Sequence, residues 1–471
     1  MYFERIYDEG LAEASYIIAC QATNQAIVVD PVRDLDIYFD RLDELGYDIT
    51  GVAETHIHAD FLSGGRDLAR ATGATLYISG EQEEGWEYDG LEGIEYVELN
   101  DEDDIELGGV VIRALHTPGH TPEHLSYLVT DTAQADEPMM LLSGDFAFVG
   151  DLGRPDLLEK AAGEMGTAKK GARQLFDSVR DKLLELPDTV QIWPNHGAGS
   201  ACGKALGAIP TSTVGYERKN AWWAPYFEGE GDVDGFIDEL LAGQPESPKY
   251  FRNMKQMNRD GVDGGDTLPT LSELTPRGFK RALEENDAVL LDARSKEDFA
   301  EGHVPGAINL PSVKAVSTHA GWVVPYDRPL VIYAQKEDLD EVRRRLYRIG
   351  FTDFAGYIPR LEGYADQLEA YEVLEASQVR SELESDEAVA VDVRSQNEFD
   401  EEHVAGAIHA HYGTIDEAGD ELPRDKELLV YCGSGARANV AISVLKKAGF
   451  KRLKNAGGFD ALAEAGVPVE G

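Results

Sequence analysis

The chain has 471 residues, of which 42% are hydrophobic, and its formal net charge at pH 7 is −45. This length exceeds what one hydrophobic core supports and predicts about two to four domains. The acidic residues are spread along the whole chain and would repel nucleic acid and anionic membranes, so we expect neither as a partner. Such acidity also predicts adaptation to high salt, as in a halophile, because salt screens the self-repulsion.

Cysteine is rare, and the three cysteines, Cys20, Cys202 and Cys432, are far apart. An odd number at such spacing predicts no disulfide framework and fits a reducing cytoplasm. The N-terminus lacks the basic and apolar regions of a signal peptide, and no apolar run is long enough for a membrane span. We therefore expect a cytoplasmic protein, and we expect it to form a homo-oligomer. Cys20 ends a predicted strand, where a buried apolar role is favoured over a reactive one.

The first part of the chain alternates predicted strands, at 14–20, 25–31 and 47–53, with one amphipathic helix at about 35–45. The third strand leads into His56-Ile57-His58-Ala59-Asp60, and a helical pattern begins at Gly64. Two imidazoles and a carboxylate within five residues are ligand types of a Zn or Fe site. The alternative is a surface loop with two ordinary histidines.

Three further strand ends carry the same kinds of side chain. His120 follows the predicted strand 110–115 within a Pro-Gly turn, Asp145 follows the apolar run 139–143, and His196 follows 190–194. One histidine in a loop signifies little, but four strand ends that each deliver His or Asp predict a metal site.

Four motifs, in this order, resemble the metallo-β-lactamase superfamily over about residues 1–245: Thr55-His56-x-His58-x-Asp60, Pro118-Gly119-His120-Thr121, Ser143-Gly144-Asp145 and Pro194-Asn195-His196-Gly197. The resemblance implies an α+β domain, an αβ/βα sandwich with the metal at one edge. Dinuclear zinc hydrolases of this superfamily, such as glyoxalase II, have a histidine directly after the motif aspartate. Here that place is Phe61, which cannot bind a metal.

Without that ligand, the remaining set is His56, His120 and Asp145. Two histidines and one carboxylate suit mononuclear non-haem Fe(II) and leave positions for substrate and O₂. The sequence thus resembles the persulfide dioxygenase branch, as do the stretches 148–156 and 196–204. Fe(II) is the expected cofactor and Zn the less favoured one. A small-molecule thiol persulfide and O₂ are the expected substrates.

The same resemblance implies that His58, Asp60 and His196 orient the metal ligands and hydrogen-bond water or substrate. His116 and His124, in contrast, are expected at the surface of the turn that carries His120.

Two further residues have two interpretations each. Arg154 is a candidate anchor for an anionic substrate, since guanidinium groups match carboxylates, or it forms a surface ion pair. Cys202 follows a glycine-rich loop after His196 and either holds sulfane sulfur beside the iron or is a small structural residue. The aromatic stretch 216–226 is expected to pack against the sandwich rather than to line a channel.

Proline, glycine and aspartate are enriched at 243–248 and 261–266, which predicts a connector at 246–268. Beyond it the chain repeats with a period of about one hundred residues: residues 290–299 realign with 390–399, and 302–308 with 402–408. We predict two copies of an α/β domain with a parallel sheet, at 269–373 and 374–471. The pattern Asp-x-Arg followed by Phe-x-x-x-His-x-x-Gly-Ala-Ile resembles rhodanese domains. Its residues Asp292, Arg294, Asp392 and Arg394 are expected to form structural ion pairs.

The second copy contains Cys432-Gly433-Ser434-Gly435-Ala436-Arg437 before a helix predicted at 438–448. A helix N-terminus, backbone N–H groups and Arg437 around the thiol would stabilise a thiolate or persulfide anion. Cys432 is therefore the predicted sulfur-transfer nucleophile, and this six-residue loop resembles that of sulfurtransferases. The first copy has Ala334 at the cysteine position and lacks the glycines, so it is expected to be inactive.

The whole order resembles bacterial and archaeal persulfide dioxygenase–rhodanese fusions that act in sulfide detoxification. The resemblance implies oxidation of low-molecular-weight thiol persulfides to sulfite, thiosulfate or both, coupled to sulfur transfer at Cys432. Two alternatives stay open: a Zn-dependent thioester hydrolase fused to a sulfurtransferase, and a sulfur-carrier or sensing protein in which the oxygenase is idle.

Overall fold

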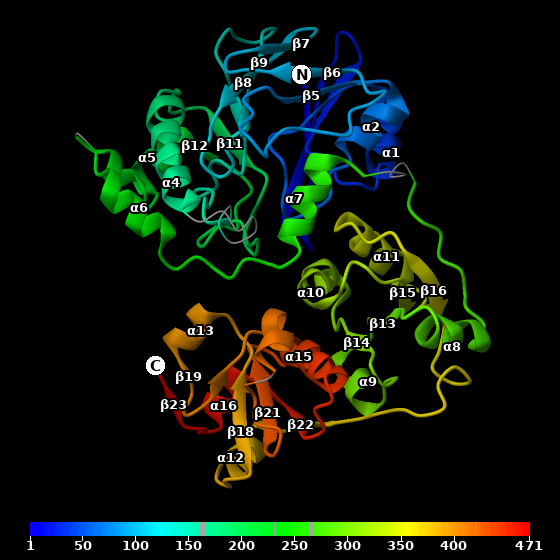
Figure 1. Cartoon of the computed structure of the whole chain (residues 1–471). Coiled ribbons are helices and arrows are strands. Elements are labelled where there is room, and N and C mark those ends of the chain that lie inside the picture. The colour runs from blue at the N-terminus through cyan, green and yellow to red at the C-terminus, as the bar shows by residue number, and fades with distance from the viewer. Residues whose placement is uncertain (158, 160–165, 230, 263–266, 420) are drawn as a thin grey trace. The chain divides into compact units, whose positions relative to one another are not determined.

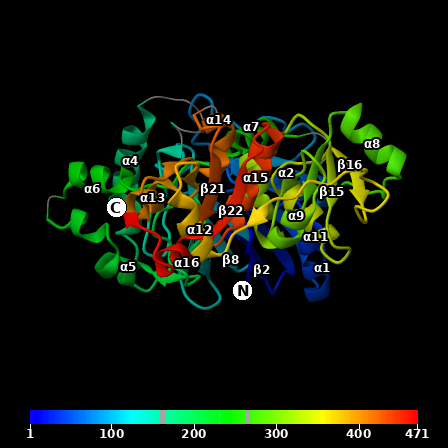
Figure 2. The ribbon, with the colours of Figure 1, turned by 90° about the horizontal axis from the view of Figure 1, so that it is seen from below.

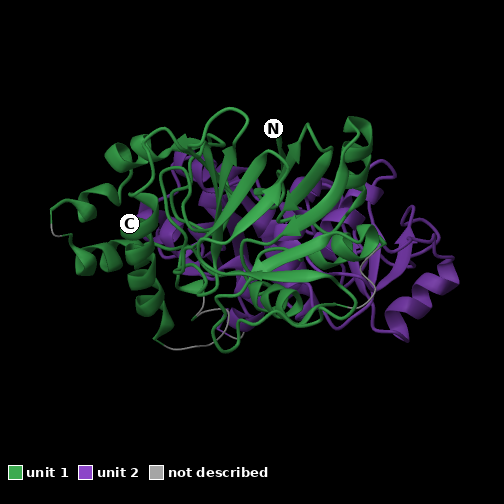
Figure 3. Cartoon of the chain, turned by 90° about the horizontal axis from the view of Figure 1, so that it is seen from above, with its two compact units in different colours: residues 1–268 green, residues 269–471 purple. Residues whose placement is uncertain are grey.

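The computed structural model describes residues 1–471 except 158, 160–165, 230, 263–266 and 420. The chain divides into two compact units, unit 1 at residues 1–268 and unit 2 at residues 269–471 (Figure 3). Among the described residues, no helix combines the length and the apolar character needed to cross a membrane.

Unit 1 is built on two six-stranded sheets (Figure 1). The first contains, in spatial order, β1 (Tyr2–Asp8), β2 (Glu13–Cys20), β3 (Gln25–Val29), β4 (Asp48–Ala53), β5 (Thr75–Ser79) and β6 (Tyr96–Leu99). The second contains β12 (Ser212–Thr213), β11 (Gln191–Pro194), β10 (Met140–Gly144), β9 (Leu125–Asp131), β8 (Val110–His116) and β7 (Asp104–Leu107). One apolar core joins Tyr16 and Ile18 of the first sheet to Ile112 and Val129 of the second. The sheets therefore face each other, and alternate side chains of each strand fill the space between them.

Helices cover the outer faces of the two sheets. Among the described residues of unit 1 these helices are α1 (Asp36–Leu45), α2 (Gly65–Thr72), α4 (Thr167–Ser178), the π-helical turn η1 (Val179–Leu183), α5 (Val214–Asn220), the 3₁₀ turn η2 (Ala224–Phe227), α6 (Val233–Leu241) and α7 (Phe251–Asp260). α4 buries Ala168, Ala172, Leu175 and Phe176, the apolar stripe of an amphipathic helix. With Leu141 and Ile192, the residues Ala172, Leu175 and Phe176 form a second core behind the second sheet. The expected αβ/βα sandwich is confirmed.

The aromatic stretch packs against this second core, as predicted. Trp223 is buried, and Trp222, Tyr226 and Phe227 lie against the same cluster as Phe236 of α6. The structure differs from the prediction of a connector at 246–268. Residues 251–260 form α7, which belongs to unit 1 and buries Phe251, Met254 and Asn258. The glycine-rich part of the prediction at 263–266 lies outside the described residues.

Unit 2 contains the two predicted repeats, and the sheet of each is parallel. The first copy consists of α8 (Pro276–Glu284), β13 (Val289–Asp292), α9 (Lys296–Glu301), β14 (Ile308–Asn309), η3 (Val313–Ala315), α10 (Val316–Val323), β15 (Leu330–Tyr333), α11 (Leu339–Arg348) and β16 (Phe354–Ile358). Its strands lie in the order β14-β13-β15-β16. β13 is buried along its whole length, as expected for a parallel strand covered on both faces.

The second copy consists of β17 (Glu372–Val373), α12 (Ala376–Leu383), β18 (Ala388–Asp392), α13 (Gln396–Glu401), β19 (His403–Val404), β20 (Ile408–His409), η4 (Tyr412–Thr414), α14 (Ile415–Ala418), β21 (Glu427–Cys432), α15 (Ala436–Lys447), β22 (Leu453–Gly458), α16 (Phe459–Glu464) and β23 (Val469–Glu470). Its main sheet has the order β17-β22-β21-β18-β20. β19 and β23 form a separate antiparallel pair. α15 lies along β21 and β22 (Figures 1 and 2).

The two copies share buried contacts within unit 2. Trp322 of α10 in the first copy belongs to the apolar core of the second copy, beside Tyr412. Asn439 of α15 donates to Asn309 of β14 at 2.6 Å across the copies. The first copy therefore forms part of the structural support of the second.

Candidate functional site

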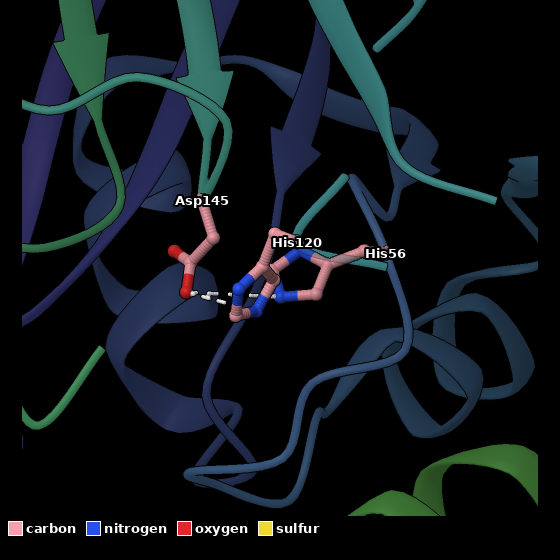
Figure 4. Close-up of side chains that lie close together, drawn as sticks. All are labelled: His56, His120 and Asp145. Carbon is pink, nitrogen blue, oxygen red and sulfur yellow. Dashed lines mark ion pairs between the residues drawn. The ribbon is translucent and has the colours of Figure 1, made fainter. Parts of the chain in front are cut away.

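Three strand ends of unit 1 bring His56, His120 and Asp145 together (Figure 4). His56 follows β4, His120 lies in the turn between β8 and β9, and Asp145 follows β10. The Oδ2 atom of Asp145 lies 3.4 Å from Nε2 of His120 and 4.0 Å from Nε2 of His56. All three side chains are buried.

The atoms of this cluster fit a bound metal ion. Nε2 of His56 and both carboxylate oxygens of Asp145 are buried without a hydrogen-bond partner in the part of the chain that the structure describes. Unpartnered buried polar atoms are costly, and a metal ion would satisfy them. The other ring nitrogens are held from behind, Nδ1 of His56 by the Thr55 hydroxyl at 2.9 Å and Nδ1 of His120 by the Arg154 carbonyl at 3.2 Å.

Electrostatics also favour metal-binding forms of these residues. Burial lowers the pKa of His120, and it lowers the pKa of His56 well below its usual range, with His58 adding to the effect. Burial opposes ionisation of Asp145, but the nearby His196 holds the pKa of that carboxyl well below its usual range. Neutral imidazoles and an ionised carboxylate are the protonation states that bind metals.

A second cluster, Asp60, His196 and Cys202, lies beside the first. Nε2 of His196 is 3.2 Å from Oδ2 of Asp60 and 3.4 Å from Oδ2 of Asp145, and it has no hydrogen-bond partner among the described residues. Burial opposes protonation of His196, but the Asp145 carboxylate raises its pKa well above the usual range. Burial raises the pKa of Cys202 to about 12, so its thiol stays protonated at neutral pH. A sulfur-holding role of Cys202 stays a prediction.

His58 belongs to a carboxylate network that is not among the features predicted from the sequence. Its Nε2 lies 3.0 Å from Oδ1 of Asp30 and 3.5 Å from Oε2 of Glu54. Asp30 also accepts hydrogen bonds from the backbone and hydroxyl of Thr55 and, at 2.6 Å, from Asn195. Asp30 thus ties the end of β3 to the loops that carry His56 and His196. In the sequence, the position of Asp30 at the end of a buried strand, directly before Pro31, is the signal that could have identified it.

The expectation that His124 lies at the surface was wrong. His116 is partly exposed, but His124 is fully buried. Nε2 of His124 accepts a hydrogen bond of 3.0 Å from the backbone N–H of Asp145. Gly144, at φ 52°, permits this approach, because a Cβ there would lie 2.6 Å from Nε2 of His124. His124 therefore positions a candidate metal ligand through its backbone.

Arg154 is buried instead of forming a surface ion pair. Its guanidinium pairs with both oxygens of Asp156, at 2.8 and 2.7 Å, and donates to the carbonyls of Ala201 and Pro245. These contacts hold the loop before Cys202 and the segment after α6. They give Arg154 a structural role, and its predicted role as a substrate anchor has no support in them.

α7, from the predicted connector, holds the loop that carries the first histidines. The Asn258 amide donates to the carbonyls of His58 and Phe61, at 2.8 and 2.7 Å, and accepts from the N–H of Ser63 at 2.9 Å. The Phe61 ring is buried, with its centroid 4.4 Å from that of His58. Phe61 fills space beside the cluster and offers no ligand atom.

In unit 2, Cys432 is the last residue of β21 and its side chain is buried. The backbone N–H of Gly435 donates to its Sγ at 3.1 Å. Gly435 has φ 86°, a left-handed conformation that favours glycine, and α15 begins at the next residue. The thiol therefore lies in a loop that presents N–H groups at a helix N-terminus, as predicted.

Arg437 lies against this loop and is paired with a carboxylate of the same copy. Its two terminal nitrogens are 2.6 and 2.8 Å from the carboxylate oxygens of Glu398 on α13. Burial opposes ionisation of Glu398, but the Arg437 contacts lower its pKa to about 2. A Cβ on Gly433 would lie 3.3 Å from Nη2 of Arg437, so the guanidinium lies directly over the loop.

The first copy has the same frame without the thiol. Ala334 is buried at the end of β15, and α11 begins only at Leu339. The Asp-x-Arg residues form a bidentate pair in each copy: Nη2 of Arg294 is 2.6 Å from Asp292, and Nη2 of Arg394 is 2.7 Å from Asp392. The expected structural ion pairs are confirmed.

Comparisons with known proteins match both units. The family model of the metallo-beta-lactamase superfamily matches residues 9–196, and that of the rhodanese-like domain matches 275–358 and 375–465. The chain is similar to the crystal structure of a metallo-beta-lactamase from Staphylococcus aureus subsp. aureus COL, at 43% identity and a TM-score of 0.69 over 76% of this chain and 99% of that one. Since unit 1 holds only 268 of 471 residues, this match reaches into unit 2.

Curated relatives match over less than half of this chain. A probable polyketide biosynthesis zinc-dependent hydrolase, BaeB, from Bacillus velezensis is 25% identical over 45% of this chain and 85% of its own length. A hydroxyacylglutathione hydrolase from Acaryochloris marina is 31% identical over 38% of this chain and 63% of its own length. The superfamily and the clustered donor atoms together imply a bound metal.

Proposed function

The chain belongs to the metallo-beta-lactamase superfamily and carries two rhodanese-like domains, and on this basis we propose that it is an iron-dependent persulfide dioxygenase coupled to sulfur transfer. The observation that carries the proposal is the donor set of His56, His120 and Asp145, with Phe61 where a further ligand would extend it. Two histidines and a carboxylate would hold mononuclear Fe(II), which supplies O₂ activation when bound.

The proposed reaction consumes a thiol persulfide, O₂ and water. The S–S bond of R–S–SH breaks, the thiol R–SH is released, and the terminal sulfur is oxidised to sulfite. O₂ is the oxidant and supplies two oxygen atoms, water supplies the third, and two protons are released. No other oxidant or reductant is needed.

Residues around the donor set have separate tasks in this proposal. His124 fixes Asp145 through the Asp145 backbone N–H. Asp60 and His196 face the same donor atoms and would hydrogen-bond the persulfide or a water molecule. The buried Phe61 ring packs against His58 and offers no ligand atom.

At the second site, Cys432 would carry sulfane sulfur as a persulfide. Attack of sulfite on the terminal sulfur would form a new S–S bond, release the Cys432 thiolate and give thiosulfate. In the reverse direction, the Cys432 persulfide would be formed from thiosulfate. The Gly435 N–H and the helix N-terminus would stabilise the Cys432 thiolate, which is the leaving group when thiosulfate forms and the nucleophile in the reverse direction, where sulfite leaves.

A Zn-dependent thioester hydrolase is the second candidate, because the matched relatives include a zinc-dependent hydrolase and a hydroxyacylglutathione hydrolase. The two candidates differ in metal and in co-substrate. The hydrolase would consume a thioester and water, without O₂.

The test measures metal content and O₂ uptake on full-length protein purified without added metal, in high-salt buffer. We expect iron at about one equivalent, and O₂ uptake with glutathione persulfide. Asp145→Ala should lose the metal and the uptake. His116→Ala is the matched control, because His116 is partly exposed and outside the donor set. Bound zinc with hydrolysis of S-lactoylglutathione, and no O₂ uptake after Fe(II) loading, would overturn the dioxygenase proposal.

A further inference from the structure

We propose that Lys296, a residue of the first rhodanese copy, is a positioning residue for the sulfur-transfer site of the second copy. The inference rests on the proposed role of Cys432 and adds a function to the copy that lacks a cysteine. It starts from one contact: Nζ of Lys296 donates to the backbone carbonyl of Ser434 at 2.6 Å.

The Ser434 carbonyl belongs to the peptide group that contacts the thiol. The same peptide bond joins Ser434 to Gly435, and its N–H donates to Sγ of Cys432 at 3.1 Å. The carbonyl and the N–H of a trans peptide point in opposite directions. An ammonium on the carbonyl therefore fixes the orientation of the N–H and strengthens its dipole, and both effects favour negative charge on the sulfur.

The first copy holds Lys296 in place. Lys296 is the first residue of α9, and the Ser295 hydroxyl caps that helix by accepting from the N–H of Asp298. The residue before the cap, Arg294, is paired with Asp292. The Lys296 side chain is about one-third exposed and lies 3.9 Å from Glu297. Because the helix cap and the ion pair fix the backbone at Lys296, its side chain loses less conformational entropy when it binds the loop.

Buried amides keep the two copies in register beneath the loop. Asn455 of the second copy donates to the Gly435 carbonyl at 3.0 Å and to Asn439 at 3.1 Å. Asn439 in turn donates to Asn309 of the first copy at 2.6 Å. Both peptide groups around Gly435 are therefore fixed, one by Asn455 within the second copy and the other by Lys296 from the first.

The repeat itself provides a matched control. The position of Lys296 in the first copy corresponds to Gln396 in the second, at the start of α13. Gln396 is exposed, and its amide donates to Asp400 at 2.7 Å within its own helix. Substitution at the two positions changes equivalent helix starts, of which Lys296 donates to the cysteine loop and Gln396 donates to Asp400 of its own helix.

The experiment compares Lys296→Met, Lys296→Arg and Gln396→Met in the full-length chain. Alkylation of Cys432 by iodoacetamide is followed by peptide mass spectrometry as a function of pH, which separates Cys432 from Cys20 and Cys202. At pH 7 we expect the Met variant at position 296 to react about threefold to tenfold more slowly, with its pH profile moved to higher pH. Lys296→Arg should retain most of the rate, and Gln396→Met should behave as wild type.

A purely structural role of Lys296 would not give this pattern. If Lys296→Met kept the wild-type pH profile, or lowered the melting temperature without changing that profile, the inference would be wrong. A separate measurement tests the proposed function: wild-type protein incubated with thiosulfate should gain one sulfur atom on Cys432. Failure to gain it would overturn sulfur transfer at Cys432, whereas sulfur loading with an unchanged Lys296→Met profile would overturn only the role of Lys296.

Discussion

The two rhodanese-like copies of unit 2 share a frame and differ in the loop that follows one strand. Both have the bidentate Asp-x-Arg pair at the end of a buried strand, and a serine that caps the next helix. After β21 the second copy has Cys432 and a left-handed Gly435, whereas after β15 the first copy has Ala334 and no glycine before α11. The fold depends on the residues that both copies keep. The proposed chemistry depends on the loop that only one copy has.

The largest expected effect tests the difference between the loop after β21 and the loop after β15. Cys432→Ser should lower thiosulfate–sulfite sulfur exchange by about 10³-fold or more, because the nucleophile is lost. Ala334→Cys in that background should not restore it, because residues 335–338 contain no glycine to turn the backbone N–H groups toward a thiol. Sulfur transfer assays with thiosulfate check both variants. Recovery of activity with Ala334→Cys would show that the loop is not what separates the copies.

The shared ion pairs should contribute alike to both copies. Asp292→Asn and Asp392→Asn leave Arg294, which is mostly shielded from solvent, and the buried Arg394 without their carboxylates, so each should lower the free energy of unfolding by about 3 kcal/mol. Urea unfolding followed by tryptophan fluorescence measures this loss. A large loss in one copy and none in the other would contradict a common frame.

The contact between the copies should make stability depend on pH. His319 of α10 is buried with its ring centroid 5.6 Å from that of Tyr412, and burial, with a contribution from Arg437, lowers its pKa to about 4. Between about pH 6.5 and pH 4, the unfolded chain binds a proton at His319 and the folded chain does not. The free energy of unfolding should therefore fall as pH drops from about 6.5 to about 4, by up to about 3 kcal/mol.

His319→Phe should remove this dependence, which urea unfolding at several pH values measures. An unchanged pH dependence in that variant would assign the effect to other groups.

The smallest effect concerns the pair that only the second copy has. Glu398→Gln breaks the contact with Arg437. It should lower the free energy of unfolding by about 1 kcal/mol at neutral pH, since partly exposed ion pairs contribute little to stability. Because the pKa of Glu398 is lowered from 4.5 to about 2, the contribution is complete above pH 4.5 and is lost as pH falls toward 2. Asp298→Asn, at the corresponding place in the first copy, is the control. An equal loss of unfolding free energy in both variants would contradict this difference between the copies.

The sequence by itself determined most of the architecture and the chemistry-bearing residues. Period-2 and helical patterns located β2, β3, β4 and α1 within a few residues, and the repeat of about one hundred residues revealed the two copies. The donor residues His56, His120 and Asp145 also came from sequence, because each directly follows or lies between predicted strands. These signals are local, so the order of residues is enough to detect them.

Only the tertiary structure decided which distant residues support the two sites. His124, expected at the surface, positions Asp145, and Asn258, expected in a connector, holds the loop that carries His58. Lys296 reaches a loop 138 residues away. Such contacts depend on how complete elements pack, and local propensity and spacing contain no information about long-range packing. A buried polar side chain finds its hydrogen-bond partner wherever the fold brings one, and that partner is visible only after folding.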